Sequence, residues 1–157
     1  MAENANLPTD KVELENVRLI FRNFEGREDA FNPRGQRSTK VVLTPEQYQQ
    51  LAALGYNVKL KESRFEDQDP QPQIEVFLRF DIMPPNVWQV TSRGKTLLSA
   101  NNVAVLDTAN ILNVDMIIRP YNWESPQGTG RKAMLADIWV TIEESRFDLK
   151  YADLPAQ

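Results

Sequence analysis

The sequence has 157 residues, of which 41% are hydrophobic and 25% are charged, and its formal net charge is −4. This length and composition indicate one globular domain with a single core, neither disordered throughout nor embedded in a membrane. The absence of cysteine and histidine excludes disulfides, thiolate metal sites and any mechanism that needs a histidine base. We therefore expect no catalytic residue, no metal site and no cofactor.

The charges are distributed unevenly along the chain. Residues 1–15 carry a net charge of −3 and residues 143–157 a net charge of −2, whereas residues 16–142 carry +1. Residues 16–40 are clearly basic, with six basic side chains against three acidic ones. Charge alone fits a merely solvated surface as well as it fits a surface that binds a polyanion.

The two ends of the chain show no hydrophobic periodicity. We expect residues 1–10 to form a flexible N-terminal arm, residues 11–152 a single domain, and residues 153–157 a short C-terminal tail. Residues 1–10 contain no basic stretch followed by an apolar run, which predicts an intracellular protein without a secretory signal.

Alternating apolar and polar residues predict a first strand over residues 13–24. In this strand Val17, Leu19 and Phe21 are expected to face the core, and Arg22 and Phe24 the opposite side. A glycine-containing turn follows, and residues 37–43 predict the second strand of a hairpin with a basic loop at its tip.

A helix is predicted to begin after Thr44, because Pro45 suits its first turn and Gln47 stands at the capping-box position. Gly55 ends it. The buried stripe of this helix is expected to consist of Tyr48, Leu51, Ala52 and Leu54.

Residues 57–61 and 74–80 predict further strands, separated by an acidic loop over residues 62–73. Residues 87–91 and 96–98 form a short hairpin with a basic tip, and residues 114–123 and 131–142 form a longer hairpin with a glycine turn. In the second arm of the longer hairpin Met134, Ile138, Val140 and Ile142 are assigned to the core, with Ala133, Leu135, Asp137 and Trp139 opposite. Residues 103–112 fit either a short helix or a strand broken at Asp107.

This succession of short strands around one capped helix predicts a mainly β fold. The leading candidate is a small OB-fold-like β-barrel with one or two short helices and β-hairpin insertions.

Aromatic and basic residues recur two to four positions apart, and alternate positions of a strand share one face. Single-stranded nucleic acid needs cations along its phosphates and flat rings on which unpaired bases stack. We favour ligand contact over core packing for Tyr121 and Trp123, and the reverse for Phe77 and Trp139, whereas Trp88 fits either role. The candidate nucleic-acid-binding residues are Arg22, Phe24, Arg34, Arg37, Lys40, Lys59, Lys61, Phe77, Arg79, Arg119, Tyr121, Trp123, Arg131 and Lys132.

Four segments resemble the bacteriophage single-stranded DNA-binding proteins that have an OB-fold: residues 14–24, 55–60, 113–123, and 140–144 with 151–152. The most specific is the run Asn-Val-Asp-Met-Ile-Ile-Arg-Pro-Tyr-Asn-Trp at 113–123. The resemblance implies sequence-non-specific binding of single-stranded DNA, without catalysis, during phage replication, recombination or repair in the cytoplasm of the infected bacterium. It also implies replication or recombination proteins, or further copies of the chain, as partners.

The sequence departs from many such proteins at its end, where residues 153–157 contain one acid instead of an acidic tail that recruits partners. Two alternatives remain open. A structural or interaction protein of a phage particle would use the same arginines only to pair with carboxylates. A carboxylate-metal nuclease would need acids that converge in space.

Overall fold

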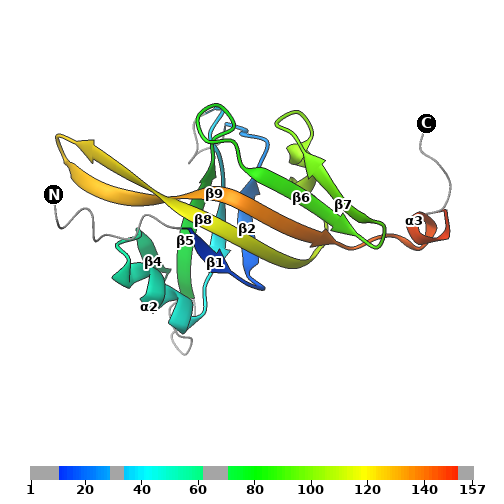
Figure 1. The fold of residues 1–157 in the computed structure, drawn as a ribbon, viewed down its shortest axis with the longest axis horizontal. Coiled ribbons are helices and arrows are strands. Elements are labelled where there is room, and N and C mark those ends of the chain that lie inside the picture. Colours follow the sequence, from blue (N-terminus) through cyan, green and yellow to red (C-terminus); the bar gives the residue numbers. More distant parts are fainter. Residues whose placement is uncertain (1–10, 29–33, 62–70, 152–157) are drawn as a thin grey trace.

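The computed structural model describes residues 11–28, 34–61 and 71–151 (Figure 1). The predicted N-terminal arm and C-terminal tail lie outside these residues, as do most of the predicted acidic loop and the side chain of Lys61. No helix among the described residues is long and apolar enough to cross a membrane.

The described chain is mainly β and forms one nine-stranded sheet. Its strands are β1 (Val12–Leu14), β2 (Arg18–Asn23), β3 (Arg37–Val42), β4 (Val58–Lys61), β5 (Gln71–Leu78), β6 (Asn86–Thr91), β7 (Gly94–Leu98), β8 (Ile111–Ser125) and β9 (Gly128–Ile142). The main path through the sheet is β1-β8-β9-β5-β3-β2, while β4 pairs with β5 and the β6–β7 hairpin pairs with β9. The pairs β5–β9 and β6–β9 are parallel.

The sheet curls back on itself around the core. The N–H of Val17, just before β2, donates to the carbonyl of Val114 in β8 at 2.9 Å. This contact brings one end of the sheet path to a strand near the other end. The result is a partly open, OB-fold-like barrel, as the sequence pattern predicted.

The long hairpin of β8 and β9 is the dominant element, and its tip extends beyond the barrel in Figure 1. The hairpin was predicted, although both arms are longer than the pattern indicated, with 15 residues each. The ambiguous segment before it forms a short 3-10 helix, η1 (Val103–Asp107), and β8 then begins at Ile111.

Helix α2 (Pro45–Ala53) begins at the predicted capping box. The N–H of Gln47 donates to the Thr44 hydroxyl at 3.1 Å, and the N–H of Thr44 donates to the Gln47 side-chain oxygen at 2.9 Å. Leu51 is buried as expected, whereas Ala52 is exposed, so the predicted stripe was wrong at that position. A short helix, α3 (Arg146–Lys150), follows β9.

The predicted roles of Phe21 and Phe24 are both wrong. The predicted first strand is divided into β1 and β2, and β2 contains a bulge: Ile20 pairs with Lys40, but the next paired residue, Asn23, is opposite Ser38. Phe21 lies in this bulge with φ +49°. The extra residue reverses the side of the strand on which the following side chains lie. Phe21 is therefore 72% exposed, and Phe24 is fully buried in the core.

A second bulge changes the expected core of β9. Ile117 pairs with Asp137 while Ile118 pairs with Leu135, so Ala136 is the extra residue. Residues 133 and 135 face the core before the bulge, and residues 138 and 140 face it afterwards. The assignments of Ala133 and Leu135 to the opposite side were therefore wrong. Met134 is buried as predicted, but on the other side of the strand from Ala133 and Leu135.

Candidate nucleic-acid interface

A continuous patch of side chains lies where β5, β8 and β9 meet, on the side of the sheet opposite the core. Phe77 pairs with Met134 of β9 and with Ser38 of β3. Lys132 pairs with Tyr121 in the hairpin. Paired residues in a sheet project to the same side, so β-sheet register alone brings rings and cations from distant segments together.

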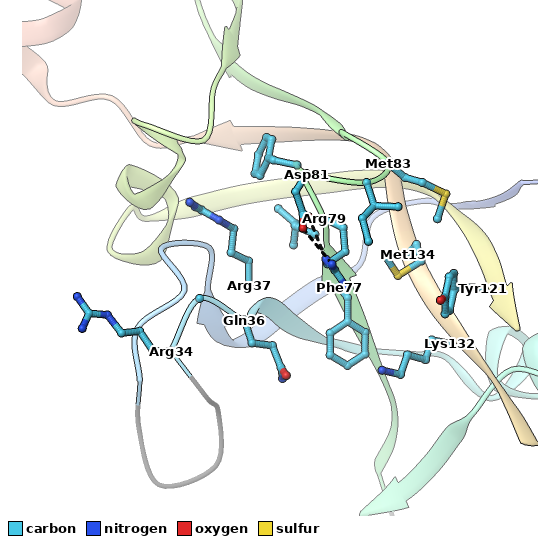
Figure 2. A pocket seen from close by; sticks show the side chains of 14 residues that line it. Arg34, Gln36, Arg37, Phe77, Arg79, Asp81, Met83, Tyr121, Lys132 and Met134 are labelled. Carbon is cyan, nitrogen blue, oxygen red and sulfur yellow. Dashed lines mark hydrogen bonds and ion pairs between the residues drawn. The ribbon is translucent and has the colours of Figure 1, made fainter. Parts of the chain in front are cut away.

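Two neighbouring hollows indent this patch. The Tyr121 hollow, with a volume of about 460 Å³, lies among the start of β3, the segment after β5, and the hairpin (Figure 2). The Trp123 hollow has a volume of about 260 Å³ and lies among β3, β4, β5 and the hairpin. Phe77 and Lys132 line both hollows, so we treat the two as one basic groove.

Of the predicted site residues, the basic groove brings together nine. Arg34, Arg37, Phe77, Arg79, Tyr121 and Lys132 line the Tyr121 hollow, and Lys40, Lys59, Phe77, Trp123 and Lys132 line the Trp123 hollow, with Phe77 and Lys132 common to both.

The rings of the groove are accessible to different degrees. Tyr121 is 44% exposed, and Figure 2 shows it on the hairpin above Lys132. Trp123 is half-buried and its ring lies against Gly130, where an added Cβ would be only 2.5 Å from the ring. Phe77 is half-buried, with the Lys132 ammonium 4.9 Å from its ring centroid. All three rings thus keep part of their surface exposed, including that of Phe77, for which the sequence favoured core packing.

Phe21 is an aromatic residue that sequence reasoning missed. Its ring lies beside the groove, because the ammonium of Lys40, a lining residue of the Trp123 hollow, is 5.4 Å from the ring centroid. The sequence signal for this position is weak, since the alternation of β2 places Phe21 in phase with core residues and only the bulge turns it outward.

The groove is strongly positive although the chain is acidic. Its lining contains six cations and two carboxylates: Arg34, Arg37, Lys40, Lys59, Arg79 and Lys132, against Glu75 and Asp81. Both carboxylates have partners. Asp81 accepts two hydrogen bonds from Arg79, each 3.0 Å long, and Glu75 accepts one from the Ser38 hydroxyl at 3.2 Å. The hydrogen bond from Arg79 lowers the pKa of Asp81, so this carboxylate stays ionised and engages Arg79 at neutral pH.

Two of the arginines predicted to contact phosphates form hydrogen bonds within the fold. The guanidinium of Arg22 donates to the carbonyls of Leu106 and Ala109, at 2.8 Å each, beside η1. Arg131 is buried and donates to the Leu54 carbonyl at 2.9 Å and to the Asn122 side chain at 2.8 Å. Because these hydrogen bonds engage both guanidinium groups within the fold, they argue against the predicted phosphate contacts of Arg22 and Arg131.

The remaining predicted residues have mixed positions. Arg37 lines the Tyr121 hollow but also donates to the Phe24 carbonyl at 2.6 Å and lies 5.3 Å from the Phe80 ring centroid. Arg119 is half-buried and lies outside the lining of both hollows. Phe24 is in the core and cannot stack on a base.

The fold resembles solved structures of single-stranded DNA-binding proteins from bacteriophage Enc34. The Enc34 protein in complex with ssDNA matches with a TM-score of 0.57 and 15% identity, over 87% of this chain and 89% of that chain. Its C-terminal truncation matches with a TM-score of 0.56 and 15% identity, over 86% of this chain and 87% of that chain.

Comparison with curated proteins gave no match. The profile of the family described as "Putative phage ssDNA-binding domain" matches residues 1–157. The match spans the whole chain, and the chain therefore belongs to this family of phage ssDNA-binding domains.

Proposed function

We propose that this chain binds single-stranded DNA without strong sequence preference, through the basic groove. The observation that carries the proposal is the alternation of rings and cations along one surface: Phe77, Tyr121 and Trp123 lie among Lys40, Lys59 and Lys132. Membership in the phage family supports the same function. The Enc34 relative of similar fold, solved with ssDNA, supports it further.

In this mechanism the cations follow the phosphates and the rings hold the bases. Lys59 and Arg34 are exposed at opposite parts of the groove, and Lys132 lies between the two hollows. Unpaired bases stack on Tyr121, Trp123 and Phe77, and each stack contributes about 1–3 kcal/mol. We add Phe21 to this set, because its ring is the most exposed aromatic beside the groove. Paired bases keep their faces inside the duplex, so the rings favour single strands.

We also propose that the protein acts without catalysis and serves phage replication, recombination or repair in the cytoplasm of the infected bacterium. Its role is then to protect or organise the displaced strand, with replication or recombination proteins, or other copies of itself, as partners. Incubation of labelled ssDNA with the protein and Mg²⁺ tests the first point. Intact DNA is the expected result, and cleavage that a chelator abolishes would establish a nuclease instead.

The binding function is tested by fluorescence anisotropy of labelled oligonucleotides together with intrinsic tryptophan fluorescence, at low and high salt. We expect the single strand to bind, with quenching, and a matched duplex to bind much more weakly. Affinity for the single strand should fall steeply with salt, because each neutralised phosphate releases counterions. Absence of affinity for both nucleic acids would overturn the proposal and favour a structural protein of the phage particle.

A further inference from the structure

The side of β9 that forms the groove continues past it. Before the bulge at Ala136, Lys132 and Met134 lie on the side opposite the core. After the bulge, Ile138 and Val140 are the buried residues, so Asp137 and Trp139 project to the outer side. The bulge changes the outward-facing positions from even to odd numbers, so the outer side of β9 carries Lys132 before it and Asp137 and Trp139 after it.

A second group of rings and a cation lies on this continuation. Trp139 pairs with Trp88 of β6, and Trp88 pairs with Leu97 of β7, so the three side chains form one row across the sheet. Both tryptophans are half-buried and Leu97 is 52% exposed. The ammonium of Lys95 lies 4.2 Å from the Trp88 ring centroid. We call Trp88, Trp139, Leu97 and Lys95 the tryptophan platform.

The surface between the groove and the platform is compatible with a polyanion. Arg119 pairs with Met134, and its Nε atom is buried without a hydrogen-bond partner among the described residues. Two acids lie on this path, and both have partners. Asp137 is 4.0 Å from the Lys11 ammonium and accepts a hydrogen bond from Asn86 at 2.9 Å. Asp115 of β8 pairs with Trp139 and accepts hydrogen bonds from the N–H of Asn16 at 2.8 Å and from the side chain of Asn113 at 3.1 Å. From Lys132 to Trp139 the strand advances roughly 23 Å, at about 3.3 Å per residue.

We propose that a bound single strand leaves the groove along β9 and stacks on the tryptophan platform. This inference rests on the proposed function and extends the same site. The platform repeats the chemistry of the groove, since an ammonium over an aromatic ring occurs in both, as Lys132 over Phe77 and as Lys95 over Trp88. This repetition and the shared strand favour DNA over a protein partner.

The test uses oligo(dT) of about 4 and about 16 nucleotides, the range of site sizes found for single OB-folds. The shorter strand occupies the groove alone, whereas the longer one also reaches the platform. Trp88→Ala and Trp139→Ala should each weaken binding of the longer strand about 5-fold to 150-fold and leave the shorter strand unaffected. Trp123→Ala should weaken both strands.

Two controls separate loss of stacking from loss of folding. Trp88→Phe keeps a ring and should retain affinity for the longer strand. Val105→Ala removes an exposed apolar side chain of η1 that lines neither hollow and is not part of the platform, and should change neither affinity.

A direct readout comes from the double variant Trp123→Phe and Trp139→Phe, in which Trp88 is the only remaining tryptophan. Its emission should be quenched by the longer strand and not by the shorter one. Unchanged emission, with equal affinities of the platform variants and the parent for the longer strand, would overturn the proposal and leave the platform to a protein partner. If the parent bound neither strand, the proposed function would fail, and the extension with it.

Discussion

Phe21 and Phe24 stand three positions apart, and the structure predicts opposite consequences for their replacement by alanine. Phe24 is fully buried, so Phe24→Ala should lower the free energy of unfolding by about 3–5 kcal/mol, through lost burial and the cavity left behind. Phe21 is 72% exposed and its contact is the Lys40 ammonium at 5.4 Å. Phe21→Ala should therefore cost at most about 1 kcal/mol of stability.

The effect on binding should be reversed. Losing the stack of one base on Phe21 corresponds to a rise in Kd of about 5-fold to 150-fold for single-stranded DNA. Phe21→Tyr retains the ring and should bind like the parent protein. Urea unfolding gives the stabilities and fluorescence anisotropy gives the affinities. If Phe21→Ala destabilised the fold as much as Phe24→Ala and left DNA affinity intact, the bulge and the placement of the groove edge would both be refuted.

Three further predictions follow from the groove. Asp81→Asn releases Arg79 from its two hydrogen bonds, so affinity for single-stranded DNA should rise and the slope of log K against log salt should steepen by about 0.7. In the parent protein the same release should occur when the pH falls through the lowered pKa of Asp81, so acid should raise the affinity of the parent but not that of the variant. An equal response of the two proteins to acid would contradict this prediction. Gly130→Ala places a Cβ 2.5 Å from the Trp123 ring, so the displaced ring should show a red-shifted emission and weaker quenching by DNA; an unaltered spectrum would count against the packing described. Arg131→Met should lower the free energy of unfolding by about 1–3 kcal/mol, because it leaves the Leu54 carbonyl unpaired, and should keep the salt slope, whereas Lys132→Met should make the slope shallower by about 0.7 with little change in stability. A reversed result for this adjacent pair would mean that their sides of the strand are exchanged.

The sequence predicted correctly those elements that are determined by residues close together in the chain. The capping box of Thr44 and Gln47 involves four consecutive residues, and the structure confirms both of its hydrogen bonds. The β8–β9 hairpin was predicted because two alternating segments flank a glycine turn. What the pattern could not show is a bulge, since one inserted residue leaves the alternation on either side intact and only reverses its phase. Phe21, Ala133 and Leu135 were assigned to the wrong side for this reason.

The site was predictable where strand register alone determines which residues meet. Tyr121 and Trp123 share one side of β8, and Lys132 is paired with Tyr121 across the hairpin. The arginines failed for a different reason, because their partners come from distant parts of the chain. Arg22 reaches the carbonyl of Leu106, 84 residues away, and Arg131 reaches that of Leu54, 77 residues away. No pattern near either arginine distinguishes it from a free cation on the surface.

The combination of an acidic chain with a basic groove bears on how the protein would discriminate among nucleic acids. A net charge of −4 opposes general attraction to any polyanion. The groove is positive, with six cations against Asp81 and Glu75, so phosphates are attracted to this surface more than to the chain as a whole. This attraction acts on single strands and duplexes alike. The stacking rings add binding free energy that duplex DNA cannot gain, because it offers no unpaired base faces. Selectivity for single strands would thus follow from the rings, and attachment to the groove from its cations.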